Sequence, residues 1–182
     1  MALVAGLVTW VLTSQHQAVA TITPGQLSQM ATAGNPYNAP EVPKGKAAPG
    51  FSLPRLGGGQ AVTSESFRGK PLVVNFFASW CPNCAKELGA FGAVSAQSSG
   101  KVGFVGIDTN DHAPATATSL LRKAGDRYPV GVDPQAALAS RYLVAALPVT
   151  FFVSPSGRVV GEVYGAQTKA DLLRWVHRLE SS

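Results

Sequence analysis

Cys81 and Cys84 are the residues best suited to chemistry, and they are the only two cysteines of this 182-residue chain. In the first turn of a helix, the two residues between them would bring the sulfur atoms within disulfide reach. Free backbone N–H groups and the helix dipole would stabilise a Cys81 thiolate there and lower its pKa. The pair therefore predicts thiol–disulfide exchange, with Cys81 attacking a disulfide and Cys84 resolving the mixed disulfide.

The neighbours of the two cysteines suit a polypeptide substrate. Pro82 fits the first turn of a helix, because its missing N–H would have no helical partner there. Trp80 offers a flat apolar wall against which a polypeptide can dock. We expect Trp80, Pro82 and Asn83 to contact the substrate, and we expect no cofactor besides a redox-active Cys81–Cys84 disulfide.

Two structural roles compete with this redox role. A disulfide that closes so short a loop constrains the unfolded chain little, because the stabilisation grows with loop length. A structural zinc ion usually needs four ligands, and the remaining candidates are His16, His112 and His177, of which one lies in the N-terminal segment and one near the C-terminus. We therefore expect no metal site.

The strand before Cys81 and the helix after it are both visible in the sequence. Residues 71–78 (PLVVNFFA) form a continuous apolar run, which is typical of a strand buried on both faces of a sheet. Residues 83–98 carry an apolar stripe at helical spacing, although Gly89 and Gly92 weaken the helix. A strand-to-helix junction is the setting in which a pair of closely spaced cysteines favours redox chemistry.

The rest of the folded part alternates between strands and helices. The segment Ser154-Pro155-Ser156-Gly157 predicts a turn, and Thr168 is the expected N-cap of the last helix. Predicted strands cover residues 51–53, 60–62, 101–108, 128–132, 149–153 and 158–164, and predicted helices cover 115–124, 134–142 and the segment after 168. The order ββαβαβαββα predicts an α/β domain with a mixed sheet.

The composition changes after the first forty residues, which contain no Lys, Arg, Asp or Glu. Residues 1–20 fit a signal peptide, since an apolar run precedes the small-x-small pattern Ala18-Val19-Ala20. Because this segment has no Lys or Arg, a truncated membrane anchor and a stray apolar tail are alternatives. The Pro- and Gly-rich residues 21–46 predict a linker or a loosely packed arm, and residues 47–182 the folded domain. We expect the domain to lie outside the cytoplasm, either secreted or membrane-anchored.

The charge pattern argues against nucleic-acid binding. The formal net charge is +5, but the basic residues are spread thinly and form no run with interleaved aromatic residues. A mildly basic surface without a nucleic-acid partner is the better interpretation.

The chain from residue 47 onward resembles the thioredoxin superfamily and, within it, the TlpA/ResA-like exported redoxins. The resemblance rests on residues 48–53 (APGFSL), 69–81 (GKPLVVNFFASWC), 131–134 (GVDP), 147–153 (LPVTFFV) and 156–160 (SGRVV). It implies a thioredoxin fold with a mixed central sheet, helices on both faces and an N-terminal β-hairpin. It also implies an inserted helix–strand element within residues 109–146.

The resemblance further implies roles for residues far from the cysteines. Pro148 would be cis and lie opposite the dithiol, which leaves the backbone of Leu147 free to pair with an extended substrate strand. Asn75 stands where ordinary thioredoxins carry a buried acid that handles the proton of the second cysteine. Glu87 matches an acid near the active site of the exported branch, and we expect it to take the proton from Cys84. An exposed helix carboxylate is the alternative for Glu87.

Four functions fit a dithiol in such a domain. One is a reductase that keeps target cysteines reduced outside the cytoplasm, for example in cytochrome c maturation, with electrons from a membrane thiol relay or another redox partner. Another is an oxidase that uses the same site in reverse. A peroxiredoxin-type peroxidase is disfavoured by Ala78, because those enzymes usually carry Thr or Ser three residues before the peroxidatic cysteine. A copper-delivery protein is disfavoured by the cysteine spacing. We expect protein thiol or disulfide substrates and a monomer.

Overall fold

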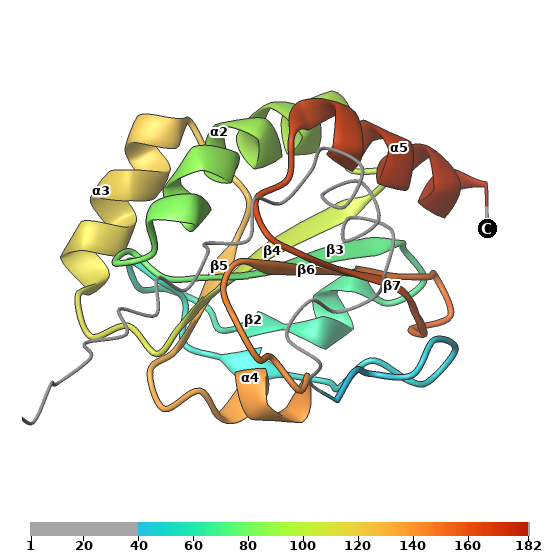
Figure 1. Ribbon diagram of the computed structural model, residues 1–182, viewed down its shortest axis with the longest axis horizontal. Coiled ribbons are helices and arrows are strands. Elements are labelled where there is room, and N and C mark those ends of the chain that lie inside the picture. The colour runs from blue at the N-terminus through green and yellow to red at the C-terminus, as the bar shows by residue number, and fades with distance from the viewer. Residues whose placement is uncertain (1–39, 182) are drawn as a thin grey trace, which may run out of the picture. The chain divides into compact units, whose positions relative to one another are not determined.

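A five-stranded sheet with the strand order β5-β4-β3-β6-β7 lies at the centre of the fold (Figure 1). The structure is a computed structural model that describes residues 40–181. The expectations for residues 1–20 and for most of the predicted linker lie outside the described residues. The strands of the sheet are β3 (Leu72–Phe77), β4 (Gly103–Thr109), β5 (Val130–Asp133), β6 (Val149–Val153) and β7 (Val159–Tyr164). β3, β4 and β5 are parallel, whereas β6 is antiparallel to both β3 and β7.

Helices cover both faces of this sheet. On one face lie α2 (Pro82–Gln97), α3 (Pro114–Ala124) and α5 (Lys169–Glu180). The short α4 (Ala137–Arg141) packs on the other face, together with the hairpin of β1 (Ser52–Leu53) and β2 (Val62–Thr63). The predicted α/β thioredoxin fold with its N-terminal hairpin is confirmed. A 3-10 helix at Ser64–Phe67 was not predicted.

The two faces of the sheet have separate apolar cores because side chains alternate along each strand. All six residues of β3 are buried, as the apolar run predicts. Val74 and Phe76 face α4 and the hairpin, whereas Val73 faces α2 and α5. β3 is therefore held from both sides, and the loop that follows it has a rigid support.

Gly92 explains how α2 tolerates glycine in its interior. A Cβ atom at this position would collide with Oδ1 of Asp126 and crowd the backbone carbonyl of Gly125. Glycine therefore allows α2 to pack closely against the segment that follows α3. Burial of apolar residues on the same helix, including Leu88 and Phe91, offsets its weak helix propensity.

Residues 40–46, the described end of the predicted linker, are attached to the domain and do not form the expected loosely packed arm. The side chain of Val42 is buried in the core beneath the sheet. The N–H of Gly45 donates to the carbonyl of Val159 at 2.7 Å, and the N–H of Val159 donates to the carbonyl of Lys46 at 2.9 Å. This segment therefore pairs with the beginning of β7, which would otherwise be an unpaired sheet edge.

The strand directions bring several loops to one edge of the sheet. Parallel strands end at the same edge, so the segments after β3 and β4 lie next to each other, with Phe77 paired to Asp108. The antiparallel β6 begins at that edge, where Val149 pairs with Phe76. The loop that carries Cys81 follows β3 there.

Candidate active site

Cys81 and Cys84 form a disulfide at the beginning of α2. Cys81 is the N-cap of the helix, and Pro82 is its first residue, as expected. The N–H of Cys84 donates to Sγ of Cys81 at 3.2 Å. Cys81 is 5% exposed and Cys84 is fully buried. An incoming disulfide can therefore reach Cys81 first, which fits an attacking Cys81 and a resolving Cys84.

The predicted substrate-binding residues lie around this disulfide. The side chain of Trp80 is 58% exposed, and its indole Nε1 donates to the carbonyl of Asn110 at 2.9 Å, which fixes the ring at the surface. Pro82 and Asn83 are exposed on the first turn of α2.

The peptide bond between Leu147 and Pro148 is cis, as expected. Leu147 packs against the apolar cluster that contains both cysteines, whereas Pro148 is buried. The carbonyl of Pro148 accepts a hydrogen bond from the N–H of Gly165 at 2.9 Å, which ties the segment to the end of β7. The dithiol and the cis-proline segment therefore belong to one site.

Glu87 lies one helical turn after Cys84 and is fully buried. Its carboxylate accepts hydrogen bonds from Nδ2 of Asn75 and from the N–H of Gln167, both at 2.8 Å. This burial excludes the exposed helix carboxylate that was the alternative for Glu87. Burial raises the pKa of Glu87 to about 7, although the bonds from Gln167 and Asn75 oppose the rise.

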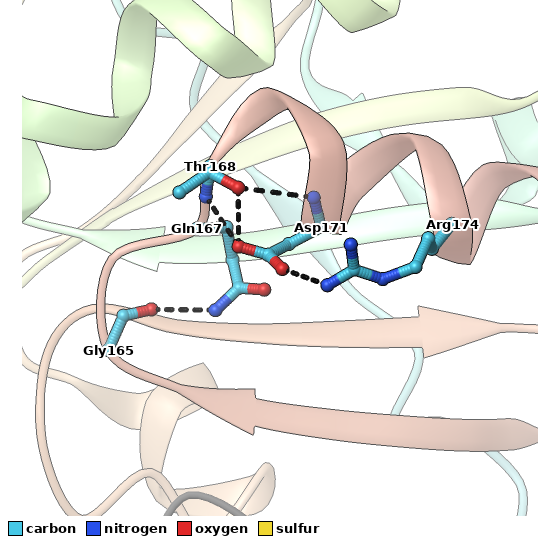
Figure 2. A network of polar contacts seen from close by, with 5 residues as sticks. All are labelled: Gly165, Gln167, Thr168, Asp171 and Arg174. Carbon is cyan, nitrogen blue, oxygen red and sulfur yellow. Dashed lines mark hydrogen bonds and ion pairs between the residues drawn. The ribbon is translucent and has the colours of Figure 1, made fainter. Parts of the chain in front are cut away.

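The N-terminus of α5 holds Gln167 in place (Figure 2). Thr168 and Asp171 form a capping box in which each side chain accepts from the other residue's N–H, and Arg174 pairs with Asp171. The side-chain amide of Gln167 donates to the carbonyl of Gly165 at 3.0 Å. These contacts direct the N–H of Gln167 toward Glu87, which belongs to a distant part of the chain.

Two further acids that the sequence did not indicate lie near the dithiol. Asp108 and Asp111 are 1% and 3% exposed. Asp111 accepts hydrogen bonds from the N–H of Ser79 at 2.6 Å and from the N–H of Ala113 at 2.8 Å. Since Ser79 is two residues before Cys81, Asp111 anchors the loop that presents the dithiol. The sequence could have pointed to both acids, because they lie at the end of a predicted strand that can be expected to neighbour the strand before the dithiol.

The part of the chain that the structure describes offers neither a metal site nor a membrane-spanning helix. Within residues 40–181, no group of three or more His, Cys, Asp and Glu side chains is arranged to hold a metal ion. Over the same range, every helix is too short or too polar to cross a bilayer.

Residues 44–161 match the AhpC/TSA family. The chain belongs to this family. It is 27% identical to the thiol-disulfide oxidoreductase ResA of Bacillus thuringiensis subsp. konkukian over 136 residues, which are 74% of this chain and 78% of ResA. It is 30% identical to the thiol:disulfide interchange protein DsbE homolog of Paracoccus denitrificans over 151 residues, with 81% and 82% of the two chains covered.

A solved structure shows the same fold. A secreted Mycobacterium tuberculosis disulfide oxidoreductase, described as homologous to E. coli DsbE, has a TM-score of 0.65 and 27% sequence identity; the match covers 71% of this chain and 96% of that one. Together with the close cysteine pair, these relatives show that the chain is a thiol–disulfide oxidoreductase of the ResA and DsbE type.

Proposed function

We propose that the protein is a protein-disulfide reductase that acts on exported proteins. The main support for this proposal is the excess of buried acidic over buried basic side chains near the dithiol. Three buried carboxyl groups lie near it, on Glu87, Asp108 and Asp111, and within residues 40–181 no Lys, Arg or His side chain is buried. A strongly oxidising dithiol is one whose reduced form is stabilised, in general through a low-pKa thiolate. Acidic neighbours oppose such a thiolate, so they favour the disulfide and make the dithiol a better reductant.

The reaction would proceed in two exchanges. The Cys81 thiolate attacks a disulfide of the substrate, whose first sulfur leaves as a thiolate and takes up a proton from water. Cys84 then loses its proton and attacks Sγ of Cys81, and the second substrate sulfur leaves in the same way. The substrate disulfide gains two electrons and becomes two thiols, while Cys81 and Cys84 become the disulfide.

Glu87 supplies the proton acceptor for the second exchange. It is buried one helical turn from Cys84, and its pKa of about 7 allows it to accept a proton at neutral pH and release it again. Asn75 and Gln167 hold the carboxylate in place while its charge changes. A water molecule can carry the proton between Cys84 and Glu87.

The extended substrate segment would bind between Trp80 and the cis-proline segment. Trp80, next to Cys81 in the chain, presents an exposed indole, and Leu147 packs against the cluster that contains the two cysteines. Disulfides of apocytochrome c before haem attachment are one substrate of this class. A membrane thiol relay would return the electrons.

Export is the cellular setting that this function needs, because disulfides persist outside the cytoplasm. The uncharged first forty residues and the secreted mycobacterial relative support it. Mass spectrometry of the protein from its native host tests the N-terminal assignment. A mature chain that begins at Thr21 supports a signal peptide, and an intact Met1 contradicts cleavage.

The reduction potential of the Cys81–Cys84 couple tests the direction of electron flow. In glutathione buffers we expect a value near the roughly −270 mV of thioredoxin, whereas a value near the roughly −120 mV of DsbA would make the protein an oxidase.

Two further assays test the peroxidase and copper-delivery alternatives. Fast hydrogen peroxide turnover would favour the peroxidase, and stoichiometric Cu(I) retained after dialysis would favour a copper carrier.

A further inference from the structure

The buried carboxyl groups of Asp108 and Asp111 form a pair beside the loop that leads to Cys81. Asp108 is the penultimate residue of β4 and is paired in register with Phe77, the last residue of β3. Asp111 lies in the turn that follows β4. The hydrogen bonds of Glu87 come from Asn75 and Gln167 and not from this pair, so the pair is separate from the proton acceptor proposed above.

The two carboxyl groups differ in their hydrogen-bond donors. Asp111 accepts from the N–H groups of Ser79 and Ala113. Within residues 40–181, neither carboxyl oxygen of Asp108 accepts a hydrogen bond. A buried carboxylate without a donor is strongly unfavourable, whereas a protonated Asp108 can donate its own O–H to Asp111. One proton held between the two groups would satisfy both of them.

The charges in the pair agree with this arrangement. Burial, the charge of Asp111 and the hydrogen bond to Asp111 together raise the pKa of Asp108 to about 7. Burial also acts to raise the pKa of Asp111, but hydrogen bonds from Ser79, Ala113 and Asp108 outweigh it and hold that pKa below its usual value. Asp111 is thus the charged partner, and Asp108 carries the proton.

The turn around Asp111 contacts the dithiol loop at two consecutive residues. Oδ2 of Asp111 holds the N–H of Ser79, and the carbonyl of Asn110 holds the indole N–H of Trp80 at 2.9 Å. Asn110 has a positive φ of 50°, and its own N–H donates to the carbonyl of Asp133 at 3.0 Å, which fixes the turn to the end of β5. Any displacement of this turn is therefore transmitted to the residues before Cys81.

We propose that Asp108 and Asp111 share one proton and together position the loop Ser79–Cys81, and that loss of this proton shifts the loop and places a second negative charge next to it. Both acids are positioning residues, because they act on the thiol through Ser79. The proposal rests on thiol–disulfide exchange at Cys81 and not on its direction.

Other titratable groups on the surrounding elements must be distinguished from this pair. They are Cys81, Cys84 and Glu87 on α2, His112 in the turn, Arg122 and Lys123 at the end of α3, and Asp133 at the end of β5. Histidine side chains also change charge near neutral pH, so His112 needs its own control. In the oxidised protein the cysteines do not titrate, which removes them from the measurement.

NMR of the oxidised full-length protein tests the shared proton. We expect the 13Cγ shift of Asp108 to report one protonation step at about pH 7, and the indole N–H of Trp80 to shift with the same midpoint. An Asp108 signal that shows a carboxylate throughout pH 5–9 would overturn the proposal, and this measurement needs no variant.

Variants then assign the step seen at Trp80. In Asp108→Asn, whose amide can still donate to Asp111, the step should disappear. It should persist in His112→Asn, in Glu87→Gln and in the matched control Asp126→Asn. Asp126 is a half-buried acid whose pKa is also raised to about 7, mainly by burial, but its hydrogen bonds are to Tyr128 and Gly92 rather than to the dithiol loop. Loss of the step in His112→Asn instead would overturn the assignment.

Alkylation of the reduced protein tests the consequence for Cys81. Rates with iodoacetamide, followed by mass spectrometry of the labelled peptide, report the thiolate fraction. At pH 8 we expect Asp108→Asn to react about threefold faster than the native protein, because one nearby negative charge is removed. At pH 6, where Asp108 keeps its proton, the two rates should be equal, and Asp126→Asn should match the native protein at both. Superimposable pH profiles for Asp108→Asn and the native protein would overturn the proposal, whatever the reduction potential proves to be.

Discussion

Glu87 and Asp108 are two buried carboxyl groups near the same disulfide, and they differ in what surrounds them. Glu87 accepts two hydrogen bonds, from Asn75 and Gln167. Asp108 accepts none from the described residues and has another acid as its neighbour. The pKa of each group is raised to about 7, with burial as the largest cause.

This difference shows that two carboxyl groups with similar pKa values can have different roles, one in proton transfer and one in positioning a loop. A carboxylate with fixed donors keeps its position in both protonation states, so Glu87 can pass a proton without rearrangement. A carboxyl without donors is satisfied only while it holds its proton. Loss of the proton from Asp108 would leave its carboxylate without a donor, and we expect the change to reach the dithiol loop through Asp111, which accepts from the N–H of Ser79. The predictions below test this contrast.

The largest effect on turnover should come from removing the thiol of Cys84, which lies one helical turn before Glu87. In Cys84→Ser, Cys81 can still attack but nothing resolves the mixed disulfide, so turnover should fall by more than about a hundredfold. Insulin reduction and mass spectrometry of the trapped adduct measure this. Cys81→Ser is the matched control and should trap no adduct. An adduct on Cys84 in that control would reverse the assignment of the two cysteines.

The next effect concerns Glu87 itself. Glu87→Gln keeps the size of the side chain but cannot take a proton, so turnover at pH 7 should fall by about tenfold to a hundredfold. The pKa of the Cys84 thiol should change as well, because a neighbouring charge is lost. Asp126→Asn removes an acid of similar pKa elsewhere and should leave both quantities unchanged. Cysteine pKa values that are the same in Glu87→Gln and the native protein would refute the role of Glu87.

These two predictions rest on residues that the sequence could identify, because local patterns point to them. The apolar run of β3 and the helix signals of α2 place Cys81 at a helix N-terminus with no knowledge of the remaining chain. The cis bond before Pro148 and the importance of Glu87 came from the resemblance to exported redoxins. The capping box at Thr168 follows from a local pattern.

Other features depend on contacts between distant segments. The sequence shows Asp108 only as a polar residue at a strand end, and the register that pairs it with Phe77 brings it near the dithiol. The buried carboxylate of Glu87 has one of its two donors only because Gln167, eighty residues later, reaches it. Val42 lies in a segment whose composition predicts a loose arm, and its burial depends on pairing with β7. Composition and periodicity place these residues in a strand, a helix or a linker, but they do not show which distant segment each one meets.

The raised pKa values of Glu87 and Asp108 should make the free energy of unfolding depend on pH. Between pH 4.5 and 7 the folded protein binds more protons than the unfolded chain, because folding raises the pKa of Glu87, so stability falls as pH rises. For Glu87 the decrease is on the order of 3 kcal/mol between pH 4.5 and pH 8. Urea unfolding of the oxidised protein should show a smaller decrease in Glu87→Gln, and likewise in Asp108→Asn. Equal pH slopes for the native protein and both variants would contradict the raised pKa values.

The smallest effect should come from Thr150, which contacts the Asn75 side chain but not Glu87 itself. Thr150 Oγ1 accepts a hydrogen bond from Nδ2 of Asn75 at 3.3 Å, the same group that donates to Glu87 at 2.8 Å. Thr150→Val keeps the shape of the side chain and removes this acceptor, which should lower stability by about 1 kcal/mol. Turnover should change less than about threefold, because Gln167 still fixes the carboxylate. Urea unfolding and insulin reduction provide the two values. A loss of turnover as large as that of Glu87→Gln would show that the orientation of Asn75, and not the carboxylate alone, controls the proton.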